Sequence, residues 1–319
     1  MNIKIGNTPL IKIKYKYNEK INYIYTKLES YNLTGSIKDR VAYYIINQAY
    51  KEEKLKKGME IVEATSGNTG ISLAAMGALF GNPVHIYMPD WVSKERLDLM
   101  KMYNAKVTLI SKEEGGFKRA IQEAINYAKE NNAFLSNQFE NQDNVLAHYE
   151  TTGQEIINKL GKDIGGFVSG IGTGGTLMGV AKKLKEVNEN VKIYALEPDK
   201  MPLLSKNQVI DNHKIEGIGD DFIPKIVEKD KIDKVILVND DDAVNMARKI
   251  ALNLGIGVGI SSGANMIASV IAKEENEGNI VTVFADDNKK YLSTDLSKPL
   301  ENNSEYISNK IEVLDYEFF

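Results

Sequence analysis

The sequence contains no cysteine, only three histidines, one tryptophan and seven prolines in 319 residues. The absence of cysteine excludes disulfides, thiolate metal sites, iron–sulfur clusters and a cysteine nucleophile. His85, His148 and His213 are far apart in the chain, so neither a metal site nor a Ser-His-Asp triad is expected. The low proline content argues against a Pro-rich linker protein.

Long apolar segments are also missing. No stretch approaches 18 uninterrupted apolar residues, and the N-terminal MNIKIGNTPL lacks the apolar core of a signal peptide. Lysine and arginine number 40 against 44 aspartates and glutamates, so the net charge is −4 and no broad basic field is available to bind nucleic acid. We therefore expect a soluble, cytoplasmic protein that binds neither membranes nor nucleic acid.

What the sequence does contain is two series of alternating apolar runs and amphipathic segments, over about 40–145 and about 165–290. This alternation predicts parallel βαβ units and open α/β sheets, and the length allows two domains. We expect the polar tail after residue 290 to lie on the surface. The expected strands are 60–64, 84–89, 106–111, 166–169, 192–197, 235–238 and 280–285; the expected helices are 41–50, 70–81, 117–130, 176–187, 241–254 and 264–272.

Three loops that lead into expected helices are rich in Gly, Ser, Thr and Asn: 65–70, 170–176 and 257–263. Ligands of open α/β sheets bind at loops of this kind, beyond the C-terminal ends of the strands. The free N–H groups and the dipole of a helix N-terminus attract anions such as phosphate or carboxylate. Each loop is also compatible with a plain helix cap or tight turn. The composition of 65–70 argues most strongly for a ligand.

Lys38 follows a short polar segment, NLTGSI, and precedes the apolar helix VAYYIINQAY. Most lysines are solvated surface residues, and Lys38 could be one of them. At such a junction, however, a lysine can be held against a buried cleft. Desolvation would then lower its pKa and make the amine a nucleophile toward an aldehyde.

Seven short motifs occur in one order along nearly the whole chain. This series resembles the fold-type II pyridoxal-phosphate enzymes, in the cysteine synthase and cystathionine β-synthase group. The motifs are GNTPL (6–10), NLTGSIKDR (32–40), EATSGNTGI (63–71), NQFENQDN (137–144), GIGTGGT (170–176), EGIGDDFIP (216–224) and GISSGA (259–264).

The resemblance implies a fold like that of the tryptophan synthase β-subunit. Two open, twisted α/β domains would hold pyridoxal 5′-phosphate in the cleft between them. Residues 1–39 and 146–319 would form a large cofactor-binding domain, and 40–145 a smaller, mobile substrate-binding domain. Family members are usually homodimers that act on small amino acids, and we expect both here.

The resemblance also implies a role for each motif residue. Lys38 would form the Schiff base with the cofactor and later move the α-proton of the substrate. Asn68 would hydrogen-bond the ring 3′-oxygen, and Ser261 would face the pyridine nitrogen. The cofactor phosphate would be held by Gly172, Thr173, Gly174, Gly175 and Thr176; the substrate would be bound by Thr65, Ser66, Thr69 and Gln138, with Gly217 near the imine.

A serine opposite the pyridine nitrogen has a chemical consequence. A carboxylate there would keep the nitrogen protonated and the ring a strong electron sink. Ser261 should leave the nitrogen neutral and the sink milder. A milder sink favours prompt loss of a β-leaving group, which gives an α-aminoacrylate that a nucleophile can attack at Cβ. The resembling family carries out this β-replacement.

The sequence departs from the family at Asp220-Asp221. Cysteine synthases resemble one another in having Ala-Gly there, and cystathionine β-synthases in having Tyr-Asp. We expect Asp220 to face the cleft near Cβ, where a carboxylate could accept a proton from a departing or attacking group. It would also repel hydrosulfide, because like charges about 4 Å apart cost roughly 4 kcal/mol at intermediate dielectric. The alternative is that both acids are solvated loop residues.

These observations leave several functions open. The first is β-replacement on L-cysteine, which releases hydrogen sulfide and adds water or a thiol to give serine, lanthionine or cystathionine; Asp220 and Asp221 are its candidate catalytic acids. The second is an ordinary cysteine synthase that uses O-acetylserine and sulfide. A threonine or serine dehydratase and a non-catalytic binding protein are further alternatives, and Lys38 argues against the latter.

Overall fold

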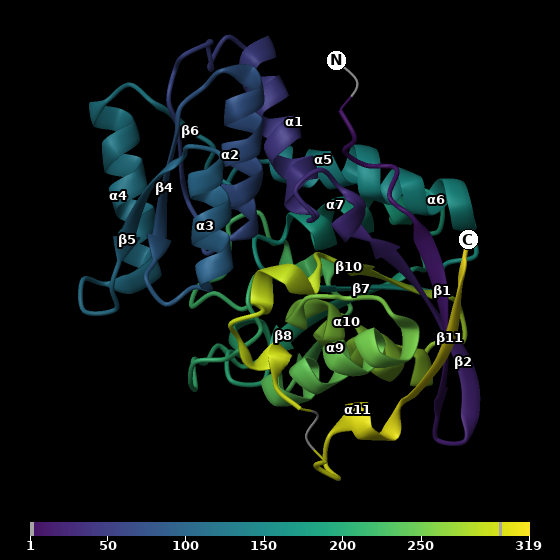
Figure 1. Ribbon diagram of the computed structural model, residues 1–319. Helices are drawn as coiled ribbons and strands as arrows, with labels where there is room; N and C mark the ends of the chain where they lie inside the picture. Colours follow the sequence, from purple (N-terminus) through teal and green to yellow (C-terminus); the bar gives the residue numbers. More distant parts are fainter. Residues whose placement is uncertain (1–2, 300–301) are drawn as a thin grey trace.

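The computed structural model describes residues 3–299 and 302–319. Two separate sheets organise these residues, as Figure 1 shows, with the smaller sheet and its helices at the upper left. The expected strands and helices are all present, with ends that differ by a few residues. The predicted α/β class with two open sheets is confirmed.

The larger sheet has seven strands in the order β11-β1-β2-β10-β7-β8-β9. Its core is parallel, from β2 through β10, β7 and β8 to β9, whereas β1 pairs antiparallel with both β2 and β11. The central parallel strands β7, β8 and β10 are buried on both faces, as βαβ connections require. The strands are β1 (Leu10–Tyr17), β2 (Lys20–Leu28), β7 (Gly166–Gly170), β8 (Lys192–Pro198), β9 (Lys234–Val238), β10 (Ile280–Phe284) and β11 (Glu312–Phe318).

Helices cover both faces of the larger sheet. On one face α9 and α10 pack against residues such as Ile24 and Val168, and on the other α6 and α7 pack against Phe167 and Ile193. We call this sheet with its helices the large lobe. Its helices are α5 (Asp143–Ala147), α6 (Gln154–Leu160), α7 (Gly175–Lys185), α8 (Leu203–Lys206), α9 (Asp240–Leu254), α10 (Ile260–Glu274) and α11 (Ile307–Lys310).

The smaller sheet has four parallel strands in the order β5-β4-β3-β6. Helix α4 covers one face, where Ala120, Ala124 and Ala128 meet Val62 and Tyr87. Helices α2 and α3 cover the other face, and α1 (Lys38–Lys51) packs on that side too. We call β3–β6 with α2, α3 and α4 the small lobe. Its elements are β3 (Ile61–Ala64), α2 (Asn68–Phe80), β4 (Val84–Pro89), α3 (Lys94–Met102), β5 (Lys106–Ile110), α4 (Gly116–Glu130) and β6 (Phe134–Leu135).

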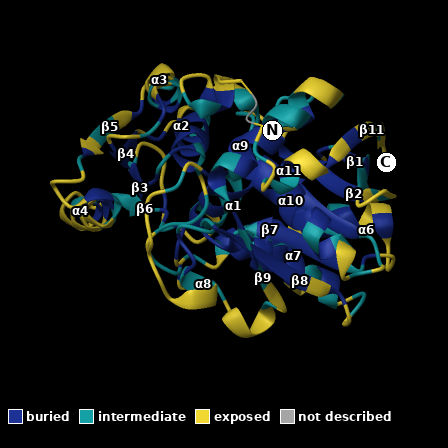
Figure 2. Ribbon diagram, turned by 90° about the horizontal axis from the view of Figure 1, so that it is seen from below, coloured by how far each residue is buried: buried dark blue, intermediate teal, exposed yellow. Residues whose placement is uncertain are grey.

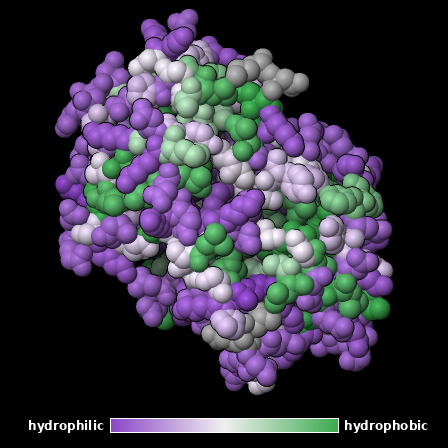
Figure 3. All heavy atoms as spheres, viewed as in Figure 1, coloured by the Kyte–Doolittle hydropathy of each residue, from purple (hydrophilic) through white to green (hydrophobic). Residues whose placement is uncertain are grey.

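Buried residues gather along the strands and on the inward faces of the helices, and exposed residues lie at the periphery (Figure 2). The face shown in Figure 3 is mostly hydrophilic, with apolar side chains scattered among the charged ones. None of the described helices is long and apolar enough to cross a membrane.

The tail after residue 290 is more regular than the sequence indicates. It starts with two 3₁₀ turns, and its end forms β11, which adds to the sheet beside β1. Val313 of β11 is buried, while most of the strand remains exposed at the sheet edge. The tail therefore lies mostly on the surface, as expected.

Candidate active site

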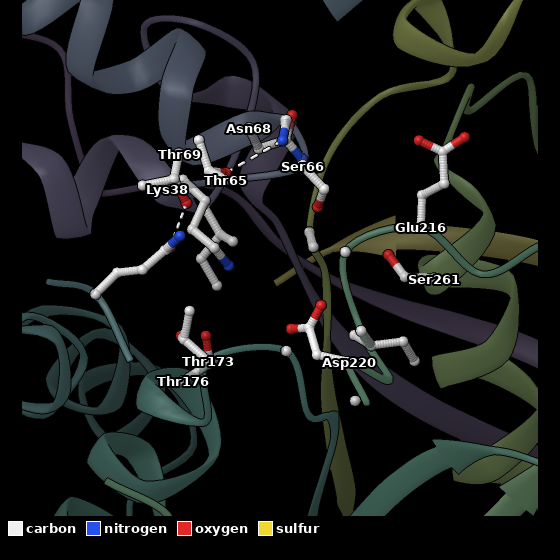
Figure 4. Close-up of a pocket in the computed structure, with 18 of the residues that line it drawn as sticks. Lys38, Thr65, Ser66, Asn68, Thr69, Thr173, Thr176, Glu216, Asp220 and Ser261 are labelled. Carbon is white, nitrogen blue, oxygen red and sulfur yellow. Dashed lines mark hydrogen bonds between the residues drawn. The ribbon is translucent and has the colours of Figure 1, made fainter. Parts of the chain in front are cut away.

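One cavity collects residues from both lobes. It is bounded by the loop after β3, the loop between β7 and α7, the start of α10 and a long segment between α8 and β9. The C-terminal ends of parallel strands and the N-termini of helices meet here, where the fold class predicts ligand binding. Figure 4 shows these side chains around a common space. The predicted site residues that line it are Lys38, Thr65, Ser66, Asn68, Thr69, Gln138, Gly172, Thr173, Gly174, Thr176, Gly217, Asp220 and Ser261.

Lys38 is the first residue of α1, and the backbone just before it is bonded to the segment that follows β10. Ile37 donates its N–H to the carbonyl of Ala285 at 2.8 Å, and Ser36 forms a β-bridge with Asp286. Burial lowers the pKa of Lys38, while Asp286 and Asp220 partly oppose that shift. The backbone at Lys38 is therefore anchored, and the amine, which lines the cavity, has an increased share of the neutral, nucleophilic form.

The Gly-rich loop before α7 is shaped by close approaches that only glycine allows. A Cβ on Gly172 would collide with the carbonyl oxygen of Gly217, and Gly174 has a φ of +89°. The loop ends at the N-terminus of an eleven-residue helix, where free N–H groups and the helix dipole favour an anion. This cradle fits a phosphate group.

Two buried polar side chains orient the hydroxyl groups of that loop. Asn144 donates to Thr173 Oγ1 at 2.9 Å, and His148 Nε2 lies 3.2 Å from Thr176 Oγ1. Burial and the nearby Lys38 lower the pKa of His148, so its imidazole is neutral. Both hydroxyls are therefore held at the helix N-terminus, where they can bind an anion together with the backbone.

The loop after β3 and the segment after β6 form a second polar cluster. Thr69 donates its hydroxyl to Gln138 Oε1 at 2.6 Å, and the Gln138 amide group donates to Ala64 O at 3.1 Å. Glu63, which is 3% exposed, accepts the Gln138 N–H at 3.0 Å. Burial raises the pKa of Glu63 to about 7. This cluster supplies hydroxyl and amide groups of the kind that bind a carboxylate at the start of α2.

Asn68 and Ser261 lie at the N-termini of α2 and α10. Asn68 donates from Nδ2 to Asp286 Oδ2 at 2.7 Å, and its Oδ1 is buried without a hydrogen-bond partner. An orphaned buried polar atom in a cavity points to a ligand that completes it. The amine, the phosphate cradle and these two polar side chains together fit pyridoxal phosphate: Lys38 would bind the aldehyde carbon, the 172–176 loop the phosphate, and Asn68 and Ser261 the ring.

Asp220 projects into the cavity. Figure 4 shows its carboxylate directed into the space that Lys38, Thr173 and Ser261 surround. Burial is the main reason that the pKa of Asp220 rises to about 6; Asp221 raises it further, and Lys38 lowers it. Phe117 and Phe139 line the same cavity, so part of its wall is apolar. A carboxyl group with a pKa near neutrality can both accept and return a proton.

Two predicted site residues do not line this cavity. Asp221 is exposed, forms an ion pair with Lys118 at 2.8 Å and lines an outer groove. Of the two acids, only Asp220 reaches the cavity. Gly175 lies behind the phosphate loop, where a Cβ would collide with the Asn144 side chain. Its role is to let Asn144 approach, because no larger residue leaves that space.

Several residues of the site carry no signal of their role in the sequence. Arg96 is 2% exposed and lines the cavity from α3, although an arginine in SKERLDLMKM reads as a solvated helix residue. Glu216 belongs to a motif that was recognised, but no role was assigned to it. Asp286, at the end of β10, binds Asn68 from 218 residues away. No local pattern in the sequence indicates that Arg96, Glu216 and Asp286 belong to the site.

Comparisons with known proteins agree with this geometry. Residues 1–286 match the family described as pyridoxal-phosphate dependent enzyme. The chain is 42% identical over 295 residues to a cysteine synthase of Staphylococcus aureus, covering 92% of this chain and 94% of that protein.

Solved structures give the same picture. A hydrogen sulfide-producing enzyme from Fusobacterium nucleatum is 47% identical, with a TM-score of 0.94 and coverage of 99% of this chain and 97% of that one. An Asp→Asn variant of a hydrogen sulfide-producing enzyme, solved with an α-aminoacrylate intermediate, is 48% identical, with a TM-score of 0.95 and coverage of 97% and 95%.

Proposed function

Because the chain belongs to the family of pyridoxal-phosphate-dependent enzymes, we propose that it acts on L-cysteine, releases hydrogen sulfide and adds water or a thiol at Cβ. The products would be serine, lanthionine or cystathionine. The chain shares with its relatives the cofactor pyridoxal phosphate and β-replacement chemistry in sulfur amino-acid metabolism. The choice of cysteine as substrate is the proposal, and the Asp220 carboxylate inside the cavity carries it.

The chemistry supplied by bound pyridoxal phosphate is withdrawal of electrons from the substrate's α-carbon, which permits loss of the β-substituent. The chain's own residues handle the protons. We assign Lys38 Nζ to remove the α-proton. Thr65, Ser66, Thr69 and Gln138 would orient the substrate carboxylate, and Gly217 would leave room beside them. These roles rest on where the side chains lie in the cavity.

Asp220 would act on the departing sulfur through its charge and on the incoming nucleophile by accepting its proton. The Cβ–S bond breaks and the sulfur leaves as hydrosulfide. The nucleophile then forms a C–O or C–S bond and gives its proton to Asp220, which releases it and so balances the proton that hydrosulfide takes up to become hydrogen sulfide. Lys38 returns the α-proton to Cα. With water the balance is cysteine plus water to serine plus hydrogen sulfide. An ionised Asp220 repels returning hydrosulfide, which favours release over capture. The similarity to a hydrogen sulfide-producing enzyme supports this direction.

The second candidate function is cysteine synthesis from O-acetylserine and sulfide. The identity of 42% to a cysteine synthase favours it, and the cavity contains the same phosphate and carboxylate clusters that either reaction needs. The two candidates differ in the expected effect of Asp220, which helps sulfide to leave and hinders its entry.

The deciding experiment incubates the purified holoenzyme with cysteine alone and, separately, with O-acetylserine plus sulfide. We expect sulfide from cysteine, with serine or lanthionine detected by mass spectrometry, and cystathionine when homocysteine is added. Lys38→Ala is the matched control that removes the reacting amine. Rapid cysteine formation from O-acetylserine, without sulfide release from cysteine, would reject the proposal in favour of the second candidate.

We also propose that residues 40–145 move as the smaller domain when substrate binds, that residues 1–39 and 146–319 form the cofactor-binding domain, and that the enzyme is a cytoplasmic homodimer. The cavity supports the proposed domain movement, because the polar cluster around Thr69 and Gln138 lies in the small lobe and the phosphate cradle lies in the large lobe. The homodimer and the cytoplasmic location rest on the family resemblance and the composition.

A further inference from the structure

The first turn of α3 carries a buried cation with contacts in both lobes. Arg96 is 2% exposed, and its Cδ and Nε lie 2.5 Å from where a Cβ on Gly67 would be. Its guanidinium carbon lies 4.7 Å from the centroid of the Tyr291 ring, and it forms an ion pair with Glu216. A buried guanidinium without a partner costs several kcal/mol, so Glu216 is what makes this position tolerable.

The ion pair joins the two lobes across the mouth of the cavity. Arg96 belongs to the small lobe, whereas Glu216 lies in the large-lobe segment between α8 and β9. That segment carries Asp220 four residues further on. In Figure 4 the Glu216 side chain points away from the space in front of Lys38, and the Asp220 side chain points into it.

The residues around Arg96 hold the same turn against the large lobe. Ser93 donates its hydroxyl to the carbonyl of Lys290 at 2.8 Å. Ser293 donates its N–H and its hydroxyl to the two oxygens of Glu95, at 2.8 and 2.7 Å. In the arrangement of the lobes seen here, the backbone that carries Arg96 is thus bound to the large lobe by contacts other than Glu216, and Arg96 can hold the 216–221 segment.

The Tyr291 ring, which lies against the Arg96 guanidinium, links Arg96 to Asp286 and Asn68. Tyr291 donates its hydroxyl to Asp286 Oδ2 at 2.7 Å, and Asn68 donates to the same oxygen. Arg96 therefore lies between the segment that carries Asp220 and the network that holds Asn68. Its loss should disturb the placement of reacting groups without removing any of them.

We propose that Arg96 is a positioning residue of the reaction: through Glu216 it holds the 216–221 segment, and with it the Asp220 carboxylate, over the cavity when the lobes are closed. The inference deepens the proposed function and rests on it, because sulfide release is the step that it affects. It assigns no substrate contact to Arg96 itself.

A double-mutant cycle on the holoenzyme tests the inference. The variants are Arg96→Met, Glu216→Gln and the double variant, with Arg96→Lys as the conservative replacement. We expect each single variant to lower kcat for sulfide release from cysteine about tenfold or more, with KM for cysteine changed less than about threefold. The double variant should lose no more than the worse single variant, because both remove one contact. Arg96→Lys should recover part of kcat.

The matched control is Lys225→Gln. Lys225 lies on the same segment and forms an exposed ion pair with Glu140 at 2.7 Å, so its loss should change kcat less than about twofold. The visible absorbance of the bound cofactor and the midpoint of thermal unfolding show whether each variant is folded and loaded. If Arg96→Met does not fold, Arg96→Lys and Glu216→Gln form the cycle.

Wild-type rates in the single variants, or losses that add in the double variant, would overturn the inference. A fall in kcat that accompanies a loss of bound cofactor would do the same, since it would indicate a merely structural role. If the wild type releases no sulfide from cysteine, the proposed function fails first. The cycle is then run in the O-acetylserine reaction, where a displaced Asp220 should hinder sulfide entry less. Equal gains in kcat in the single and double variants support the positioning role, and unchanged or lower rates reject it.

Discussion

At the scale of single residues, one cavity contains an amine and a carboxyl group whose pKa values are both shifted in favour of the uncharged form. Burial lowers the pKa of Lys38 and raises that of Asp220 to about 6, and each group partly opposes the shift of the other. Both shifts favour the uncharged forms, so the pKa values of the two groups lie closer together than those of a free lysine and a free aspartate. The arrangement suits a reaction in which one proton leaves an α-carbon and another is traded at Cβ.

The pH dependence of sulfide release should report on Asp220. The base form is needed, and an acid with a pKa of about 6 loses its proton as the pH rises through that value, so the rate should rise across pH 5–7 and then level. Asp220→Asn should lose this limb and fall about 100-fold in rate at pH 7.5. Initial rates of sulfide release from cysteine over this pH range provide the measurement.

Asp221→Asn is the matched comparison for that experiment. Asp221 is paired with Lys118 at the surface, and its charge raises the pKa of Asp220. Its removal should therefore move the limb to lower pH and change the plateau less than about threefold. A pH limb that survives in Asp220→Asn, or that vanishes in Asp221→Asn, would transfer the role from Asp220 to another group.

At the scale of elements, three helices begin at the cavity with polar side chains: α2, α7 and α10. Free N–H groups at these ends attract the phosphate and the substrate carboxylate. Helix α7 can begin where it does because Gly175 has no side chain, so Asn144 fits against its Cα. The position of the phosphate cradle thus depends on one missing methyl group.

Gly175→Ala should weaken cofactor binding. Its Cβ would overlap the Asn144 side chain, so either Asn144 or the start of α7 must move, and the bond from Asn144 to Thr173 would be lost. We expect the dissociation constant of the cofactor to rise about tenfold, measured by absorbance titration of the apo-enzyme. Lys182→Ala on the exposed side of α7 is the control and should bind normally; equal affinity in both would contradict this account.

How far the sequence predicts these elements depends on the range of the contacts. Apolar runs such as 84–89 and 280–285 form strands as expected, because burial on both faces leaves a local pattern. The strands β1, β2, β6 and β11 were not predicted. β11 gains its partner, β1, from the other end of the chain, and only one of its residues is buried, so it shows no alternating pattern.

The same limit applies to the site. The Gly-rich loops and Lys38 with its flanking residues form local motifs that can be recognised in the sequence. All but two of the site residues predicted from such motifs line the cavity. The burial of Arg96 and the contact between Asn68 and Asp286 depend on how the lobes meet. Motifs therefore identify the residues that could touch a cofactor, whereas the residues that orient them require the folded structure.

At the scale of the whole molecule, the cofactor would connect two lobes that have separate cores. Asn68 belongs to the small lobe and the phosphate cradle to the large one, so a cofactor bound as proposed would contact both. A ligand that binds only the folded state stabilises it by about 2.7 kcal/mol at 100 times its dissociation constant. Here that stabilisation should reach both lobes.

Amide hydrogen exchange with and without pyridoxal phosphate tests this expectation. Binding should slow exchange in 66–71 of the small lobe and in 172–178 of the large lobe, because both loops lose their freedom to open. Residues 121–130 on the outer helix α4 serve as the internal control and should exchange at the same rate in both states. Protection confined to one lobe would mean that the cofactor binds outside the shared cavity, and the assignment of Lys38 and the 172–176 loop to one ligand would then fail.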